Sequence, residues 1–203
     1  WEAPLVNTRL RKAWLNAGAR IGIVGPQLEL SYPSEYLGAG PETLAAIADG
    51  SHEFAEVLKS AEHPVIILGM GALTRADGEA VLATARKLAD TCNVIRDDWN
   101  GFNVLHNAAA RVGGLDIGFV PGEGGRDTAG ILAGAEAGDI DVVFLLGADE
   151  IDTAKLEKAF VVYQGHHGDA GAHCADVVLP GSAYTEKNGT YVNTEGRVQL
   201  GRQ

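Results

Sequence analysis

Two short runs made almost entirely of apolar residues constrain the fold of this chain most strongly. Pro64–Gly69 (PVIILG) and Asp141–Gly147 (DVVFLLG) have the length of strands, and polar and apolar side chains do not alternate within them. Such continuous runs are typical of strands that are covered on both faces, as in parallel sheets. Helical patterns lie between the strand candidates, so the sequence predicts an α/β fold with a doubly wound, mostly parallel, Rossmann-like sheet.

The other expected elements follow from periodicity and from proline and glycine positions. The expected helices are Pro4–Gly18, Pro41–Ala48, Ser51–Ser60 with Ser51 as its cap, Asp77–Cys92, Val104–Val112, Thr128–Ala137 and Thr153–Lys158. The expected further strands are Ile21–Val24, Asn93–Ile95, Phe160–Tyr163, Asp176–Leu179 and a hairpin pair at Thr190–Val192 and Arg197–Leu200. Ser31–Gly40 and Gly113–Asp127 are expected to be loops. The helix Asp77–Cys92 is expected to bury one side, made of Val81, Leu82, Ala85, Leu88 and Ala89.

Charge and hydropathy exclude some classes of partner. The chain of 203 residues has 27 acidic and 16 basic residues, a net charge of −11, which repels phosphate backbones. No apolar run reaches the ~18–20 residues of a membrane helix, and no signal peptide opens the chain. We therefore expect neither nucleic-acid binding nor direct membrane insertion. The chain begins at Trp1 rather than Met, and we expect it to be part of a longer polypeptide.

The cysteines limit the redox chemistry that the chain itself supports. Cys92 and Cys174 lie far apart in the sequence and are expected to be two free thiols. A cubane iron–sulfur cluster usually needs four thiolates. The chain therefore cannot supply the ligands of such a cluster.

One glycine-rich turn and one histidine-rich loop are candidate sites. Gly69–Gly71 (GMG) follows a strand, as a phosphate-binding turn does, but Thr74 takes the place of the third glycine and the helix is expected to start late. His166–Cys174 (HHGDAGAHC) contains ligand types that zinc accepts, but the spacing matches no standard set. For both segments the structural interpretation is favoured over nucleotide or metal binding.

The segment Ala175–Gln199 (ADVVLPGSAYTEKNGTYVNTEGRVQ) has both a chemical and a structural interpretation. Its polar side chains could form a site: Glu186, Lys187, Asn193, Glu195 and Arg197. The structural interpretation places a hairpin turn at Asn193–Gly196, positive φ angles at Gly189 and Gly196, and Tyr191 near Val198 across the hairpin. The structural account suffices, so we predict a fold-stabilising hairpin.

Several of these motifs carry a family resemblance. Ala175–Gln199, Leu68–Leu73 (LGMGAL) and Phe144–Asp149 (FLLGAD) resemble strand ends and the closing stretch of an α/β domain of molybdopterin oxidoreductases, which include formate dehydrogenases. Trp1–Trp14 (WEAPLVNTRLRKAW) and Tyr163–Asp169 (YQGHHGD) are similar to the large iron–sulfur subunit of respiratory complex I, the NADH-quinone oxidoreductase.

The resemblance implies an electron-transfer subunit whose cofactors lie elsewhere. In that family 4Fe-4S and 2Fe-2S clusters are bound by an N-terminal part, electrons pass from NADH towards quinone, and the C-terminal part has no molybdenum cofactor. The partners implied are other subunits of the hydrophilic arm. The implied location is a peripheral arm, on the cytoplasmic face of the bacterial inner membrane or on the matrix side of the mitochondrial one. The family layout also implies that residues 1–50 end one α/β domain and that 51–203 form a second, with its hairpin at about 190–200.

Two functions are weighed. In the first, the chain is a cofactor-free structural part of the complex I subunit, with no catalytic, cofactor-binding or metal-binding residue of its own. In the alternative, it is a fragment of a molybdopterin-dependent oxidoreductase such as a formate dehydrogenase, whose strand-end loops hold a pterin dinucleotide. A zinc enzyme built on the histidine loop is a third and weaker interpretation.

Overall fold

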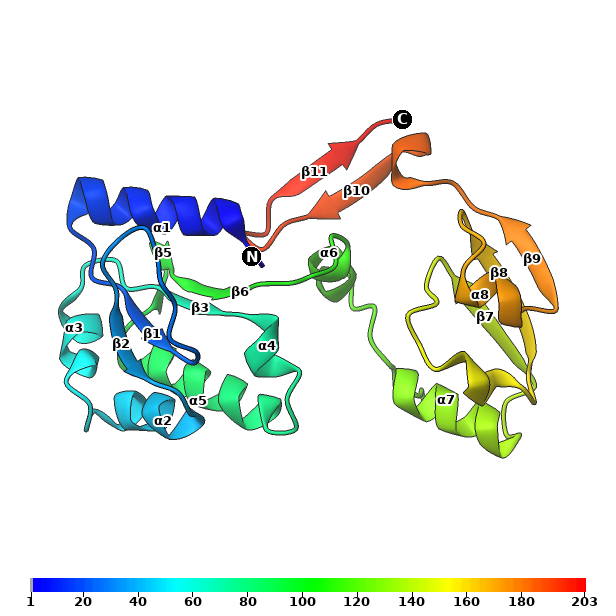
Figure 1. The fold of residues 1–203 in the computed structure, drawn as a ribbon, viewed down its shortest axis with the longest axis horizontal. Coiled ribbons are helices and arrows are strands. Elements are labelled where there is room, and N and C mark those ends of the chain that lie inside the picture. The colour runs from blue at the N-terminus through cyan, green and yellow to red at the C-terminus, as the bar shows by residue number, and fades with distance from the viewer. Residues whose placement is uncertain (1) are drawn as a thin grey trace. The chain divides into compact units, whose positions relative to one another are not determined.

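The computed structural model describes residues 2–203, which form two compact units. The first unit ends at Ala108, and the second begins at Ala109. Both units mix helices with parallel strand pairs, so the predicted α/β class with parallel sheets is confirmed (Figure 1). No helix in the described part of the chain is both long and apolar enough to cross a bilayer.

The first unit contains five helices and six short strands among its described residues. Its helices are α1 (Pro4–Ala17), α2 (Pro41–Asp49), α3 (Phe54–Ser60), α4 (Met70–Leu73) and α5 (Gly78–Thr91). Its strands are β1 (Gly22–Val24), β2 (Glu35–Gly38), β3 (Ile66–Leu68), β4 (Ile95–Arg96), β5 (Trp99–Asn100) and β6 (Phe102–Val104). β1 pairs with β2 and β3 with β6, both in parallel, whereas β4 and β5 form an antiparallel pair.

The core of the first unit lies where α2 packs against α5 (Figure 1). Its buried residues are Ile47, Ala48, Ala55, Leu88, Ala89, Cys92 and Val94. Leu82 was expected on the buried side of α5 but is 40% exposed. Because Ile47 and Ala48 share this core with α3 and α5, residues 2–108 form one unit in this structure. The division at residue 50 therefore stays a prediction about the domains of a longer protein.

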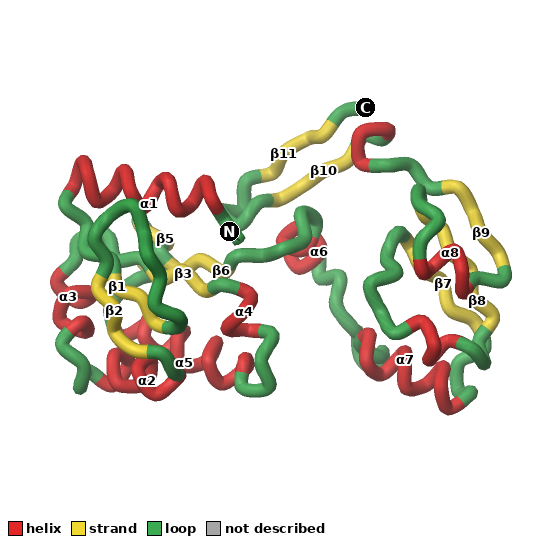
Figure 2. Tube along the Cα trace, in the orientation of Figure 1, coloured by secondary structure: helices red, strands yellow, loops and turns green. Residues whose placement is uncertain are grey.

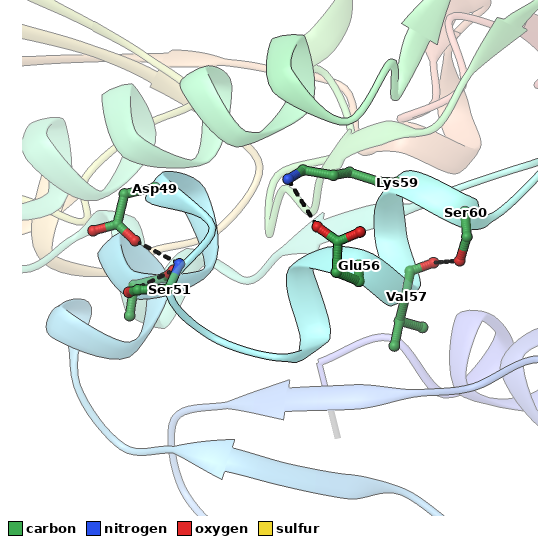
Figure 3. Close-up of polar contacts among 7 residues, drawn as sticks. Asp49, Ser51, Glu56, Val57, Lys59 and Ser60 are labelled. Carbon is green, nitrogen blue, oxygen red and sulfur yellow. Dashed lines mark hydrogen bonds and ion pairs between the residues drawn. The ribbon is translucent and has the colours of Figure 1, made fainter.

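Ser51 was expected to cap the helix that ends at Ser60, and this was wrong. α3 begins at Phe54, and Ser51 instead closes the end of α2. The Ser51 amide donates to Asp49 Oδ1 at 2.9 Å, and its hydroxyl donates to the carbonyl of Ala46 at 3.2 Å. Figure 3 shows the Asp49–Ser51 contact beside the bond from Ser60 Oγ to the carbonyl of Val57.

The second unit carries a three-stranded parallel sheet and a hairpin. Its helices are α6 (Arg111–Asp116), α7 (Thr128–Ala137) and α8 (Ala170–Cys174), with 3₁₀ turns η1 (Thr153–Leu156) and η2 (Tyr184–Glu186). Its strands are β7 (Val142–Leu146), β8 (Phe160–Gly165), β9 (Val177–Pro180), β10 (Gly189–Val192) and β11 (Val198–Gly201). The sheet order is β7-β8-β9, and β10 pairs with β11 in antiparallel register.

Helix α7 shows how the local sequence sets an element's bounds. Asp127 Oδ1 accepts from the amide of Gly130 at 2.7 Å, which satisfies a free donor of the first turn. Gly138 ends the helix in the left-handed region at a φ of 86°. The loop that joins α6 to α7 (Figure 2) is shorter than the loop expected over Gly113–Asp127, because α6 continues to Asp116.

Three other expectations were wrong. The expected loop Ser31–Gly40 contains β2. The end of β6 and the start of α6 replace the expected helix Val104–Val112. Asn93 is a turn residue with a φ of 52° rather than part of a strand.

β7 was expected to be covered on both faces, but every second residue of it is exposed. Within residues 109–203, core residues of α7 and η1 pack against the face that carries Val143 and Leu145, and this gives the burial pattern along the strand.

Candidate functional site at the carboxyl edge of the parallel sheet

The loops that follow β7, β8 and β9 meet at one edge of the sheet. In open α/β sheets this carboxyl edge is where ligands bind. The strand ends remain paired up to the edge, because Gly147 donates its amide to the carbonyl of Gln164 and Gly181 donates to that of Gly165, each at 2.8 Å. This edge also carries the histidine loop, and it is therefore the candidate functional site of the second unit.

The ligand types of the histidine loop do not converge. The rings of His166 and His167 lie edge to face, with their centroids 4.4 Å apart. His173 and Cys174 belong to α8, and Cys174 Sγ donates to the carbonyl of Gly171 at 3.4 Å. Among residues 2–203 no group of three or more His, Cys, Asp or Glu side chains is placed to hold a metal ion. The structural role of this loop stays a prediction.

Asp149 organises this edge, and the sequence pattern alone assigned it no role. Its Oδ2 accepts from the amide of Gly171 at 3.0 Å, which ties the loop after β7 to the start of α8. A Cβ on Gly171 would lie 2.7 Å from the Tyr163 ring and 2.8 Å from Asp149 Cβ. α8 therefore approaches the sheet as closely as glycine allows. The signal that could have found Asp149 is an acid at the end of a strand motif, Phe144–Asp149.

Burial and nearby acids keep two groups at this edge protonated. Burial raises the pKa of Tyr163, and the carboxylates of Asp149 and Asp169 raise it further. Burial also raises the pKa of Cys174, with smaller contributions from Asp149 and Asp176. A thiolate is the reactive form of cysteine, so Cys174 is poorly suited to nucleophilic chemistry at neutral pH.

The Gly69–Gly71 turn is occupied by a side chain of the same unit. The long helix after this turn, α5, begins only at Gly78, as expected, but a short helix that was not expected, α4, begins directly at Met70. The Met70 amide donates to Glu2 Oε1 at 2.9 Å, and a Cβ on Gly69 would lie 2.8 Å from Glu2 Oε2. A carboxylate at a helix start is favourable. The carboxylate of Glu2 therefore occupies the position that a phosphate has in a dinucleotide-binding turn.

The polar residues of Ala175–Gln199 hold the loop and the hairpin in shape. Asn193 Oδ1 accepts from the amides of Glu195 and Arg197, at 3.0 and 2.9 Å, and Gly196 has a φ of 77° as predicted. The guanidinium of Arg197 is 3.8 Å from Glu195, and both side chains are exposed. Glu186 Oε2 accepts from the amide of Ala183 at 3.0 Å.

Two details of the hairpin differ from expectation. Tyr191 faces Gln199, and Val198 faces Val192, so Tyr191 and Val198 are not directly opposite. Gly189 does not have a positive φ; it lies in β10, opposite Gly201. The hairpin packs against α6, where Gly113 lies next to Val192. The arrangement is that of a packed turn.

The fold and these strand-end loops define a class of protein, and the comparison with families agrees. The family model of the molybdopterin oxidoreductases matches residues 1–203, and the chain belongs to this family. A solved formyltransferase/hydrolase complex from Methylorubrum extorquens shares the fold, with a TM-score of 0.64 at 16% identity over 93% of this chain and 61% of that one.

More similar relatives narrow the class to one kind of subunit. The chain is 46% identical to "NADH dehydrogenase [ubiquinone] iron-sulfur protein 1, mitochondrial" of Solanum tuberosum, over 98% of this chain and 26% of that protein. It is 46% identical to a subunit of the NADH-quinone oxidoreductase of Rickettsia bellii, over 98% of this chain and 28% of that protein. The 78 kDa subunit of the Neurospora crassa NADH-ubiquinone oxidoreductase is 44% identical over 99% of this chain and 26% of that protein.

These relatives confirm the resemblance to the large iron–sulfur subunit of complex I. They support the molybdopterin-dependent alternative only weakly, since that alternative shares just the family fold. The chain spans about a quarter of the length of these relatives.

Proposed function

We propose that this chain is a structural part of the large iron–sulfur subunit of complex I and holds no cofactor of its own. In the intact enzyme that subunit takes part in electron transfer from NADH to quinone through iron–sulfur clusters. The observation that carries the proposal is the 41–46% identity to complex I subunits over 98% of the chain.

The structure supports a structural role in two ways. Cys92 is buried and Cys174 partly buried, both are free thiols, and burial raises the pKa of each. The two strand-end turns that could receive a ligand are held by the carboxylates of Glu2 and Asp149. We accordingly assign no catalytic, cofactor-binding or metal-binding residue in this chain, and place the clusters in the part of the subunit that this chain does not cover.

The partners that follow are the other subunits of the hydrophilic arm of complex I. In a bacterium this arm would lie on the cytoplasmic face of the inner membrane, and in a mitochondrion on the matrix side. The net charge of −11 supports contacts with protein rather than with nucleic acid.

The test is an analysis of the metals and pterins in the full-length subunit that contains this sequence. We expect several iron atoms per subunit, and neither molybdenum nor a pterin dinucleotide above background. The 203-residue chain alone should contain no stoichiometric iron and should oxidise neither NADH nor formate. Stoichiometric molybdenum and pterin in the full-length protein would establish the alternative, a molybdopterin-dependent oxidoreductase.

A further inference from the structure

Helix α6 and the β10–β11 hairpin are far apart in the sequence but pack on each other. Val192 of β10 is buried, and a Cβ on Gly113 of α6 would lie 3.3 Å from Val192 Cγ2. α6 precedes the β7-β8-β9 sheet in the chain, and the hairpin follows it. The contact between Gly113 and Val192 therefore joins the two ends of the segment that carries the sheet.

This contact lies outside the hydrophobic core of the sheet. The residues of that core, both the buried and the partly buried ones, all lie between Leu132 and Ala175. α6 ends before this range, and β10 begins after it. Among the described residues of α6, β10 and β11, Val192 is the one that is buried. The apolar contact that stabilises α6 and the hairpin is therefore the one that they make with each other.

Neither α6 nor the hairpin is long enough to be stable alone. An isolated helix shorter than ~12–15 residues is marginally stable in water, and α6 has 6 residues. An isolated two-stranded hairpin is also marginally stable at best. Because each element needs its contact with the other, the free energy of forming one depends on whether the other is formed.

We propose that α6 and the β10–β11 hairpin form one small cooperative unit, which opens and closes as a whole while the β7-β8-β9 sheet stays folded. Supersecondary motifs with few buried apolar contacts are the parts of a protein that open at low free energy. When this unit opens, it releases both ends of the segment that carries the sheet. The inference goes beyond the proposed function and does not rest on it, because it concerns contacts within the second unit alone.

Two substitutions away from the contact test this cooperativity by native-state hydrogen exchange of the intact protein that contains this sequence. Gly114→Ala acts on α6, because alanine favours a helix over glycine, and the nearest described atom outside the local backbone is Phe119 Cβ at 3.9 Å. Gly196→Val acts on the tip of the hairpin, where the φ of 77° opposes a side chain with a Cβ. Mass spectrometry reads the exchange of peptides that cover α6, the hairpin and the sheet.

Gly114→Ala should raise the protection of the α6 amides about two- to fivefold and that of the hairpin amides by the same factor. Gly196→Val should lower the protection of both about five- to thirtyfold. The β7-β8-β9 amides should stay within about twofold of the parent in both variants. The control Gly122→Ala, in the loop after α6, meets none of the described residues within 4 Å and should leave all three regions within about twofold.

Gly114→Ala keeps the inference testable should Gly196→Val fold poorly. A change confined to the element that carries the substitution would overturn the inference, because α6 and the hairpin would then open independently. An equal change in the β7-β8-β9 amides, or elsewhere in the protein, would also overturn it and make both elements part of a larger cooperative unit.

Discussion

Gly196 lies at the tip of the hairpin with a φ of 77°. Residues that have a Cβ adopt such a positive φ only at a cost in free energy. Gly196→Val should therefore destabilise the hairpin by about 1–2 kcal/mol, and a β-branched side chain is among the worst choices there. Among the described residues, nothing lies within 4 Å of a Cβ at this position, so the cost is backbone strain and not a clash. Thermal unfolding of the chain measures the effect.

The control for Gly196→Val is Glu195→Gln, which keeps size and removes one charge. Glu195 and Arg197 are exposed and 3.8 Å apart, so the change in unfolding free energy should be about 0.5 kcal/mol or less. A Gly196→Val variant that melts with the parent would show that the turn does not need this glycine.

Asp49 offers a test of pH dependence. Ser51 holds the pKa of Asp49 below its ordinary value, through its side chain first and then through its amide, which donates to Asp49 Oδ1. A carboxyl group whose pKa is lowered by folding stabilises the folded state at pH values above its ordinary pKa, which is about 3.9 for aspartate. This stabilisation is lost as the pH falls through the lowered pKa of the folded state. Ser51→Ala should raise the pKa of Asp49, as read by NMR titration of its carboxyl carbon.

Ser60→Ala is the matched control, because Ser60 Oγ bonds only to the carbonyl of Val57 among the contacts in Figure 3. It should leave the pKa of Asp49 unchanged. An Asp49 pKa at or above the ordinary value in the parent chain would contradict the hydrogen-bonding account.

At the scale of elements, the contact of α8 with β8 gives a sharp prediction. Gly171→Ala should lower the free energy of unfolding by about 1–3 kcal/mol, because its Cβ would meet the Tyr163 ring and Asp149 with no room to spare. Gly168→Ala, three residues earlier in the same loop, meets none of the described residues within 4 Å and should change stability by about 0.5 kcal/mol or less. Chemical denaturation compares the two variants. Equal stability would mean that α8 is not closely packed on the sheet.

The sequence predicts best the helices that have a start signal and a stop signal in their own sequence. α1, α2 and α7 begin at a proline or a capping aspartate and end at a glycine in the left-handed region, and their bounds were predicted to within a residue or two. β2 and β6 were missed. They are three or four residues long and are held by pairing with distant strands, which no local pattern encodes.

The candidate site was predicted in part for the same reason. The hairpin turn is local, so Asn193 and Gly196 could be placed from sequence. The contacts that close the strand ends join residues far apart in the chain, Asp149 to Gly171 and Glu2 to Met70. Each of these carboxylates reaches the backbone amide that donates to it only once the chain has folded.

At the scale of the whole molecule, fold and function come from different observations. The fold is shared with a formyltransferase/hydrolase complex at 16% identity, which carries no information on activity. The link to complex I rests on the far higher identity to its subunits.

The central claim is that this segment supports electron transfer without taking part in its chemistry. The direct measurement is the rate of NADH–quinone electron transfer per assembled complex, in complexes that carry His166→Asn, His167→Asn or Glu195→Gln in the full-length subunit. A general acid or base contributes about 10²–10⁴-fold to a rate, so we predict rates within about twofold of the parent for each variant. Gly196→Val should give fewer complexes but the same rate per complex. A loss of ~100-fold or more in any of the three conservative variants, with assembly and iron content intact, would contradict the account.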